Sequence, residues 1–346
     1  MFKQHLARLK NKLKKQHIPA YLCSSPADIF YLTGLPSEGL TLLVTPKSST
    51  ICTSLMYKDY AVKNLPGFKI DVHTDLIKSL HEFLRKSRIK KLWVDKHTTT
   101  VEQAEKLRKM RGCRICFESS LIEDLRIIKG PEEINRIRKA CRMTAQIVRT
   151  IRKYIHYGIR ETGLAGKISM ISADLGAKSA FDTIVSFGSH TSEPHHIADL
   201  KKLHKSMPVM IDAGVKLNGY CGDLTRMFYL GKIDGFYSQI YHVVDKAKKA
   251  AQALVKPGVK ASEIDEAGRL VFREAGYEKF FTHSTGHGIG IDVHERPKIA
   301  HKSNDVIKSG MVITIEPGLY FPGRFGVRIE DTLVVTKNGY QILTKT

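Results

Sequence analysis

Long hydrophobic segments and secretion signals are absent from this sequence of 346 residues. It contains no stretch of about 18 apolar residues, so we expect no transmembrane helix. The start of the chain is basic and lacks the apolar core of a secretory signal, which predicts a cytoplasmic location. Apolar residues make up 42% of the chain and charged residues 26%, a balance typical of a globular protein with a substantial core.

Cysteine is scarce, and acidic residues are outnumbered. The six cysteines include one close pair, Cys113 and Cys116, without a second pair nearby to complete a zinc site. We expect reduced thiols, with a redox role for this pair as the less favoured alternative.

Lys and Arg number 56 against 34 for Asp and Glu, giving a net charge of +22 spread over the chain. This charge fits a diffusely cationic enzyme or, less well, a nucleic-acid partner, because no common nucleic-acid-binding motif occurs.

The first part of the chain alternates strand and helix patterns. Four short apolar runs predict buried strands, at residues 20–23, 41–45, 49–52 and 91–94. Helical patterns are found at residues 2–15, 75–86 and 101–110. We expect the first of these helices to cover a sheet rather than to lie on a membrane surface. The alternation predicts an α/β domain.

The pattern changes near residue 125, where we place the boundary between two domains, 1–125 and 126–346. Pro131 precedes two glutamates, so a long helix is expected to begin there with acids at the positive end of its dipole. Helical patterns dominate the second domain, at residues 132–157, 160–175, 235–255 and 262–275. Two regions of paired strands interrupt them.

The first group of candidate functional residues lies in a predicted hairpin. Asn218-Gly219 between two strand-like runs is a strong hairpin signal. With these residues at the turn, Asp212 lies opposite Thr225, and Asp223 shares the face of Thr225. The two carboxylates are then diagonal neighbours, about 7 Å apart at the backbone, and could hold one cation. Alone, they fit two solvated strand acids at least as well.

Histidines occur in two loops. His287 stands among glycines in the string Gly286-His-Gly-Ile-Gly, which allows the backbone to approach a site closely, and His294 follows seven residues later. A lone histidine in such a loop is more often structural than a ligand, but two histidines favour a site. His195 and His196 form another pair, which is weak evidence in isolation.

Two apolar segments each carry an acid in what we predict to be a strand. Glu316 lies within residues 311–320 and shares a face with Thr314, and Glu330 lies within residues 326–335 and shares a face with Arg328. A buried acid costs free energy unless it is paired or binds a metal. Arg328 could instead pair with either glutamate as a structural bridge, which is the main alternative here.

Together these segments supply four carboxylates and one imidazole. Carboxylate-rich ligation suits a hard or borderline divalent ion, and paired ions generate hydroxide at neutral pH. The sequence has no Gly-x-Ser-x-Gly elbow, P-loop or Gly-x-Gly-x-x-Gly fingerprint in a suitable strand–helix context. The residues therefore predict metal-assisted hydrolysis rather than nucleophilic catalysis.

The order of these residues resembles that of the dinuclear metallopeptidases of the pita-bread fold, which include methionine aminopeptidase, Xaa-Pro aminopeptidase (aminopeptidase P) and Xaa-Pro dipeptidase (prolidase). The surrounding strings are similar as well: Ser284-Thr-Gly-His-Gly-Ile-Gly, Val293-His-Glu-Arg-Pro, Ile315-Glu-Pro-Gly-Leu-Tyr and Gly326-Val-Arg-Ile-Glu-Asp-Thr. Asp28-Ile-Phe-Tyr-Leu-Thr-Gly-Leu resembles the family's creatinase-type N-terminal domain. The resemblance implies an α/β creatinase-like domain (1–125) followed by an α+β pita-bread metallopeptidase domain (126–346).

The resemblance also implies roles. Two divalent ions would be bound by Asp212, Asp223, His287, Glu316 and Glu330, with Asp223 and Glu330 bridging them. A metal-bridging hydroxide would attack the scissile carbonyl, and Glu316 would also carry a proton to the leaving nitrogen. Manganese is the default metal, with cobalt, zinc or iron as alternatives, and a homodimer is the expected assembly.

Three further residues would act on or near the substrate. His195, with His196 as the less favoured counterpart, matches the family histidine near the substrate, and His294 would stabilise the oxyanion. Both His195 and His294 would thus be catalytic and substrate-binding, while Arg328 would orient the acids or gate the pocket. The loop 186–196 departs from the family pattern, since His190 and Glu193 are polar where small apolar residues are common. This departure affects the expected residue preference but not the chemistry.

The N-terminal domain selects among the family's branches. Methionine aminopeptidases usually lack it and Xaa-Pro enzymes carry it, so the resemblance implies hydrolysis of an Xaa-Pro bond in proline-containing peptides, by an enzyme of aminopeptidase P or prolidase type. That bond has no N–H, so a pocket for the pyrrolidine ring must replace a hydrogen bond. The alternative function is a non-enzymatic cationic binding protein, of nucleic-acid or histone type, on the same fold. Relatives of that kind generally lose metal ligands, and none is lost here.

Overall fold

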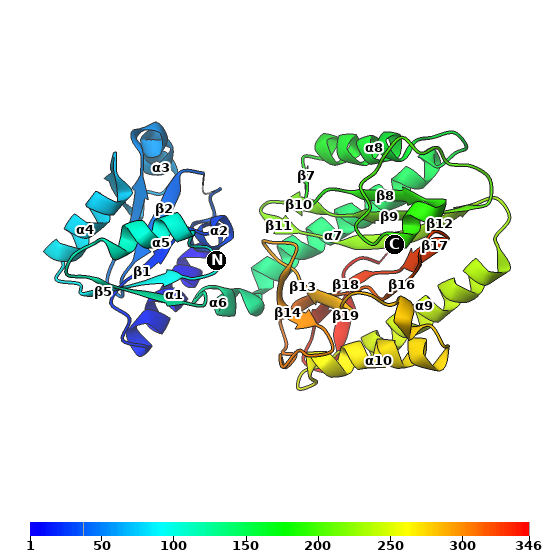
Figure 1. Cartoon of the computed structure of the whole chain (residues 1–346). Coiled ribbons are helices and arrows are strands. Elements are labelled where there is room, and N and C mark those ends of the chain that lie inside the picture. The colour runs from blue at the N-terminus through cyan, green and yellow to red at the C-terminus, as the bar shows by residue number, and fades with distance from the viewer. Residues whose placement is uncertain (37, 346) are drawn as a thin grey trace. The chain divides into compact units, whose positions relative to one another are not determined.

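The computed structural model describes residues 1–36 and 38–345, which form two compact units, Met1–Arg126 and Ile127–Thr346 (Figure 1). The first unit contains a six-stranded mixed sheet in the order β4-β3-β2-β1-β5-β6. Its strands are β1 (Tyr21–Cys23), β2 (Leu40–Val44), β3 (Ser49–Thr53), β4 (Lys69–Val72), β5 (Lys91–Asp95) and β6 (Arg114–Glu118). Its helices are α1 (Phe2–Lys15), α2 (Pro26–Thr33), η1 (Leu55–Tyr57), α3 (Lys58–Asn64), α4 (Leu76–Lys86) and α5 (Val101–Arg108), and α6 (Glu123–Ile127) follows at its end.

Local sequence explains the helices of this unit. The Asp75 carboxylate accepts hydrogen bonds from the backbone N–H groups of Ile77 and Lys78 at 2.9 and 3.2 Å, which caps α4. Thr100 and Gln103 form a capping box at the start of α5. The apolar faces of both helices pack on the sheet in one cluster, which includes Leu22, Leu43, Leu80, Leu84, Leu92, Val94 and Leu107. The predicted α/β architecture is confirmed. The edge strands β4 and β6 escaped prediction because apolar and polar residues are mixed in both and no residue of either is buried.

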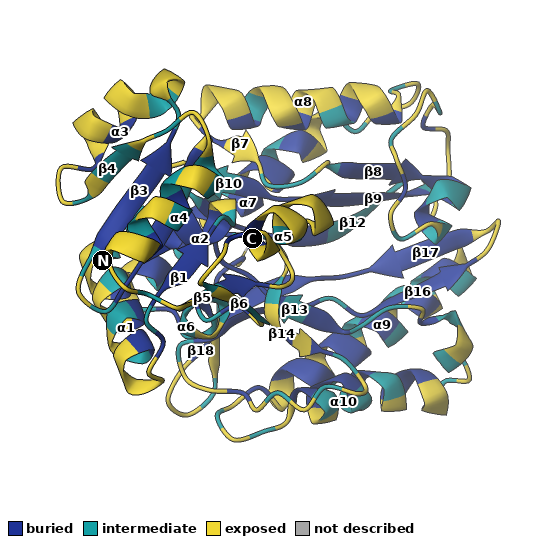
Figure 2. Ribbon diagram, turned by 60° about the vertical axis from the view of Figure 1, so that its left-hand side comes forward, coloured by how far each residue is buried: buried dark blue, intermediate teal, exposed yellow. Residues whose placement is uncertain are grey.

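The second unit has strands between two pairs of helices (Figure 1). One pair is α7 (Pro131–Ile151) and α8 (Glu161–Asp174), and the other is α9 (Gly235–Ala253) and α10 (Ala261–Glu274). The first pair packs with β8 (Ile184–Phe187), β9 (Met207–Ala213) and β12 (Leu224–Leu230) around one apolar core. Figure 2 shows buried strands between helices whose outer faces are exposed. Among the described residues, no helix has both the length and the apolar composition that a bilayer crossing requires.

The remaining elements of this unit are short. A three-stranded sheet contains β7 (Lys178–Ser179), β10 (Val215–Leu217) and β11 (Tyr220–Cys221), and a two-stranded sheet contains β16 (Gly318–Phe321) and β17 (Phe325–Arg328). A five-stranded sheet has the order β14-β13-β15-β18-β19, with β13 (Gly286–Gly288), β14 (Glu295–Ile299), β15 (Val312–Ile315), β18 (Asp331–Val335) and β19 (Tyr340–Ile342). The 3₁₀ helices are η2 (Arg152–Tyr154), η3 (Gly188–Ser192) and η4 (Glu278–Phe280).

The predicted hairpin has the predicted register. Asn218 and Gly219 adopt positive φ angles of 50° and 84°, as the two central residues of a tight hairpin turn require. Leu217 pairs with Tyr220 next to the turn, and farther along the ladder Asp212 pairs with Thr225. The turn chemistry thus fixes which residues lie opposite Asp212.

The two acid-bearing segments differ from their prediction as continuous strands. Residues 311–320 form β15 and then β16, and residues 326–335 form β17 and then β18, so each segment passes from one sheet to another. Glu316 and Glu330 lie at the breaks, outside the strands. Pro317 has no N–H to continue a ladder, and a buried carboxylate does not fit an apolar strand. The breaks therefore place each acid where the chain passes between the five-stranded and the two-stranded sheet.

Candidate metal centre

Three carboxylates converge from different strands of the second unit. Asp212 on β9, Asp223 just before β12 and Glu330 between β17 and β18 are only 8%, 5% and 1% exposed. One donor oxygen of each lies within 4.8 Å of the others. Asp212 Oδ1, Asp223 Oδ1 and Glu330 Oε1 are buried and have no hydrogen-bond partner among the described residues. Because buried anions without partners are costly, a divalent cation would stabilise this arrangement.

His287 and Glu316 extend this carboxylate cluster. His287 Nε2 lies 3.1 Å from Glu316 Oε1 and 3.8 Å from Asp223 Oδ2. His287 Nδ1 lies 3.0 Å from the carbonyl oxygen of Gly288, and since a carbonyl only accepts, Nδ1 carries a proton and Nε2 faces the acids. Thr314 Oγ1 accepts the His287 N–H and donates to Glu316 Oε1, both at 3.1 Å. The Thr314 hydroxyl thus contacts both His287 and Glu316, although Glu316 lies outside the strand that carries Thr314.

The pKa values of this cluster show how its charges are balanced without a metal. Burial and the nearby charge of Asp212 raise the pKa of Asp223 well above its usual range, and burial together with Asp223 does the same for Glu330. Burial disfavours a charged His287, but the hydrogen bond and charge of Glu316 outweigh it and raise the His287 pKa to about 9. Burial likewise disfavours a charged Glu316, but His287 lowers its pKa to about 2. Protons therefore supply the positive charge that a divalent cation would bring.

Arg328 forms hydrogen bonds both to this cluster and to the loop that precedes β9. Its Nη2 donates to Asp212 Oδ2 at 2.6 Å, and its Nη1 donates to the Pro194 carbonyl oxygen at 3.1 Å and to Tyr320 Oη at 2.8 Å. Its Nε donates to Thr225 Oγ1 at 3.2 Å. The ion pair is thus with Asp212, across from β17 to β9, rather than with either glutamate as the alternative in the sequence analysis had it.

The two candidate substrate histidines lie beside this cluster. The His294 ring is 4.4 Å from the His287 ring, centroid to centroid, and burial together with the charge of His287 lowers the His294 pKa. His195 is exposed. Burial is the largest cause of the lowered pKa values of His283 and His294, and the proximity of His195 adds a smaller contribution to both. His196, in contrast, is buried against Glu161, whose Oε2 lies 2.8 Å from its Nε2. His195 and His196 are adjacent in the sequence, but His196 contacts Glu161 and not the metal-ligand candidates.

Glycines allow β13 to fit between its neighbouring strands. A Cβ at Gly286 would overlap the carbonyl oxygen of Thr314, and one at Gly288 would overlap the carbonyl oxygen of Arg296. The close approach expected for the glycines around His287 is thus an approach to β14 and β15. It brings the His287 imidazole up to the acids.

Comparison with known proteins identifies the family. The family model "Metallopeptidase family M24" matches residues 135–337, more than half of the chain, and "Creatinase/Prolidase N-terminal domain" matches residues 5–128. This chain belongs to metallopeptidase family M24. The predicted family and the predicted fold class, a creatinase-type α/β domain followed by a pita-bread domain, are confirmed.

Named relatives of this M24 protein match it over nearly their full length. It is 34% identical over 340 residues to the Xaa-Pro dipeptidase of Pyrococcus horikoshii, covering 96% of this chain and 95% of that protein. The solved structure of an Xaa-Pro dipeptidase from Bacillus anthracis has a TM-score of 0.95 at 30% identity, with 100% of this chain and 98% of that one covered. The prolidase structure from Pyrococcus furiosus has a TM-score of 0.90 at 33% identity, covering 97% and 99%.

Three residues of the M24 domain that contact the predicted site were not singled out from the sequence. Thr225 Oγ1 donates to Glu330 Oε2 at 2.8 Å, and the hairpin register had already placed it opposite Asp212. His283 Nε2 lies 2.8 Å from Tyr320 Oη, which in turn contacts Arg328. His283 is four residues before His287, which was a usable signal. Tyr320 gave none, because it follows the unpredicted break at Pro317.

Proposed function

We propose that this protein is a metal-dependent Xaa-Pro peptidase, of dipeptidase (prolidase) type. The observation that carries the proposal is the carboxylate cluster, in which Asp212, Asp223 and Glu330 each keep one buried oxygen without a partner among the described residues. The relatives named Xaa-Pro dipeptidase support the substrate class, because the match extends over both units of the chain.

The metal ligands we propose are the five residues of the predicted set, Asp212, Asp223, His287, Glu316 and Glu330. Four carboxylates and one imidazole are donors suited to borderline divalent ions, and we propose two such ions, with Mn²⁺ as the first choice. Bound ions would lower the pKa of water and polarise the scissile carbonyl. The partnerless oxygens and the raised pKa values of Asp223 and Glu330 support this assignment.

The other residues position the substrate and move protons. Glu316, one oxygen of which faces His287 and Thr314, is proposed to pass a proton to the proline nitrogen as it leaves. His294 has a lowered pKa and therefore presents a neutral imidazole whose N–H can donate to the substrate carbonyl oxygen. His195, exposed near His294, is proposed to bind the substrate and to assist catalysis. Arg328 holds both Asp212 and the Pro194 carbonyl, and so sets the position of His195 relative to the ligands.

The division into domains 1–125 and 126–346 is supported by the two compact units Met1–Arg126 and Ile127–Thr346. We keep the first as the creatinase-type domain and the second as the catalytic domain. The cytoplasmic location and the homodimer stay predictions.

The test is hydrolysis by purified protein that is stripped of metal and then given Mn²⁺. A matched Xaa-Pro dipeptide and Xaa-Pro tripeptide are the substrates, with a Met-Ala peptide as control. Metal-dependent cleavage of the dipeptide supports the proposal, whereas cleavage chiefly of the tripeptide indicates aminopeptidase P. Cleavage of the Met-Ala control alone would overturn the substrate class. No cleavage with Mn²⁺, Co²⁺, Zn²⁺ or Fe²⁺ would favour the cationic binding protein instead.

A further inference from the structure

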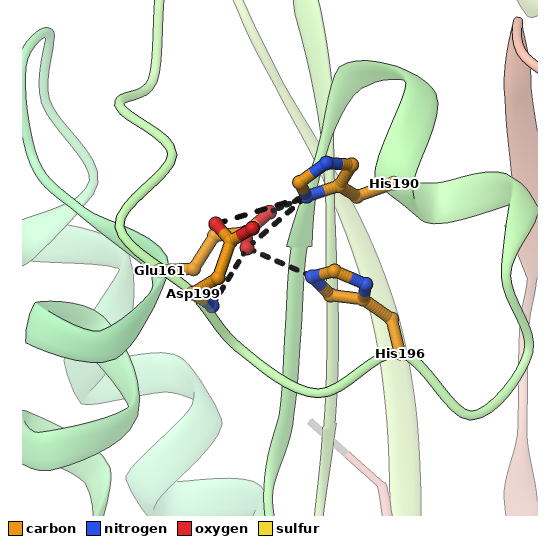
Figure 3. Close-up of side chains that lie close together, drawn as sticks. All are labelled: Glu161, His190, His196 and Asp199. Carbon is orange, nitrogen blue, oxygen red and sulfur yellow. Dashed lines mark hydrogen bonds and ion pairs between the residues drawn. The ribbon is translucent and has the colours of Figure 1, made fainter.

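A second cluster of metal-ligating side chains lies in the same unit (Figure 3). Glu161 at the start of α8, His190 in η3, and His196 and Asp199 in the loop that follows point toward one another, and one donor atom of each lies within 4.8 Å of the others. We propose that these four residues, the Glu161 cluster, bind a zinc ion that anchors the loop carrying His195.

The spacing of the donor atoms fits a tetrahedral ion. His196 Nε2 is 2.8 Å from Glu161 Oε2, His190 Nδ1 is 3.3 Å from the same oxygen, and His190 Nδ1 is 4.0 Å from Asp199 Oδ1. With zinc–ligand bonds of about 2.0 Å, neighbouring donors of a tetrahedron lie about 3.3 Å apart. These separations fall on both sides of this value, and all four donors lie within 4.8 Å of one another, so side-chain shifts without a change of the backbone would complete the site.

The donors are oriented from outside the cluster. His196 Nδ1 lies 3.0 Å from Glu193 Oε2, and zinc-binding histidines commonly use their second nitrogen in this way. The Glu161 carboxylate accepts backbone N–H groups from Phe187 at 2.7 Å and from Asp199 at 3.1 Å, which fix its position. The carboxylate is thus held in place before any ion arrives.

Charge and access also suit a divalent cation. Two carboxylates and two neutral imidazoles offset the charge of one Zn²⁺, and this donor set is one that zinc accepts. The Glu161 side chain is 0% exposed and that of His196 7%, whereas those of His190 and Asp199 are 25% and 54% exposed. The cluster therefore has a buried floor and a side open to solvent through which an ion can enter.

A bound ion would restrict the position of His195, because the residues before and after it, Pro194 and His196, would then both be held in place. Arg328 holds the carbonyl oxygen of Pro194 on one side of it, and an ion bound to His196 would hold the other side. Zinc would act as a positioning element for His195, without contact with the substrate.

The test measures metal content and does not depend on peptidase activity. In a D223N/E330Q background, the carboxylate cluster loses two proposed ligands, and zinc is then measured per chain by mass spectrometry after dialysis. We expect one zinc ion to be retained. His190→Asn keeps an amide that can hydrogen-bond to Glu161 but removes the imidazole, and should weaken zinc binding about 10- to 100-fold or more. His204→Asn, at an exposed histidine outside the cluster, should leave the zinc in place.

Two outcomes of the zinc measurement would overturn the proposal. One is a background variant that retains no zinc, and the other is a His190→Asn variant that retains as much zinc as its parent. Co²⁺ titration of the background variant, with the Glu161 cluster unaltered, needs no change in the cluster itself. It should give the intense visible absorption of tetrahedral cobalt, saturating at one ion per chain, and the absence of that band would contradict the proposal.

Discussion

The carboxylate cluster and the Glu161 cluster differ in how their donor atoms are satisfied without a metal. In the carboxylate cluster, Asp212, Asp223 and Glu330 each leave a buried oxygen without a partner among the described residues. In the Glu161 cluster, both histidines and two backbone N–H groups already bond to the Glu161 carboxylate. The first arrangement needs added protons or cations to offset its charge, whereas in the second an ion would replace only the bonds between the two histidines and Glu161.

The two clusters also differ in the secondary structure that carries their donor residues. The carboxylate cluster is built from residues on or next to β9, β12, β15 and β18, so its donors are fixed by strand pairing. The Glu161 cluster combines the first residue of α8 with a 3₁₀ helix and an irregular loop. Sites on strands hold their geometry more rigidly than sites on loops. The comparison is consistent with the catalytic role that we propose for the first cluster and the anchoring role that we propose for the second.

The largest expected effect follows from changing one partnerless acid. Asp223→Asn removes a proposed bridging ligand but keeps the shape of the protonated acid. Several kcal/mol of transition-state stabilisation by bound metal correspond to about a thousand-fold in rate, so kcat/KM for an Xaa-Pro dipeptide should fall by about that factor. The thermal midpoint of the metal-free variant should equal or exceed that of the parent, because an amide is neutral without having to bind a proton. A variant with near-normal activity would remove the distinction between the two clusters.

Replacing Arg328 should have a smaller effect. Arg328→Lys keeps the charge beside Asp212 but loses the planar fork that also reaches Thr225, Tyr320 and the Pro194 carbonyl. Because a residue that orients ligands is typically worth 10- to 100-fold, we expect kcat/KM to fall by about that much. The exposed Arg324→Lys change serves as the control and should leave activity unchanged. Equal rates for the two variants would show that Arg328 has no positioning role.

Metal removal should make stability depend on pH. The folded-state pKa of His287 is raised to about 9, so its stabilising contribution is present below its usual pKa and is lost as the pH rises toward 9. The raised pKa values of Asp223 and Glu330 act in the same direction, because the metal-free fold favours their protonated forms.

The measurement is the thermal midpoint with chelator between about pH 6 and 9, a range that spans the usual histidine pKa and the raised one. We expect the midpoint to fall by several degrees across this range, and Mn²⁺ to remove most of the fall. A midpoint that rises with pH in the metal-free protein would contradict the charge balance described for the carboxylate cluster.

A pair of glycine substitutions compares the two scaffolds. Gly286→Ala would place a methyl group against the Thr314 carbonyl, and we expect it to lower the free energy of unfolding by about 1–3 kcal/mol. Gly166→Ala lies in α8, where no atom is within 4 Å of the added Cβ, and should raise it by up to about 1 kcal/mol. Chemical denaturation measures both. A Gly286→Ala variant as stable as the parent would show that the packing of β13 against Thr314 is not tight.

Features set by short-range rules were predictable from the sequence. Asn218-Gly219 specifies a two-residue turn, and counting back from it placed Asp212 opposite Thr225. The M24 resemblance then supplied the role of each ligand, which spacing alone left open. The donor atoms of Asp212, Asp223 and Glu330 do converge, and His287 and Glu316 lie beside them.

Features that depend on tertiary contacts were not predictable. The partner of Arg328 is set by how β17 lies beside β9, which no local pattern encodes. The Glu161 cluster joins Glu161 to His190 and Asp199, which lie 29 and 38 residues further along the chain. The sequence showed only that the loop 186–196 is unusually polar. Breaks at Glu316 and Glu330 were missed because apolar periodicity continues across them.

The central claim, that the partnerless carboxylates are metal ligands, is tested most directly by anomalous diffraction from crystals soaked in Mn²⁺. We predict anomalous peaks in contact with Asp212, Asp223 and Glu330, each of which has one buried oxygen without a hydrogen-bond partner in the described ranges 1–36 and 38–345. Crystals soaked in Mn²⁺ without a peak at these three carboxylates, while manganese is bound elsewhere on the chain, would contradict the claim.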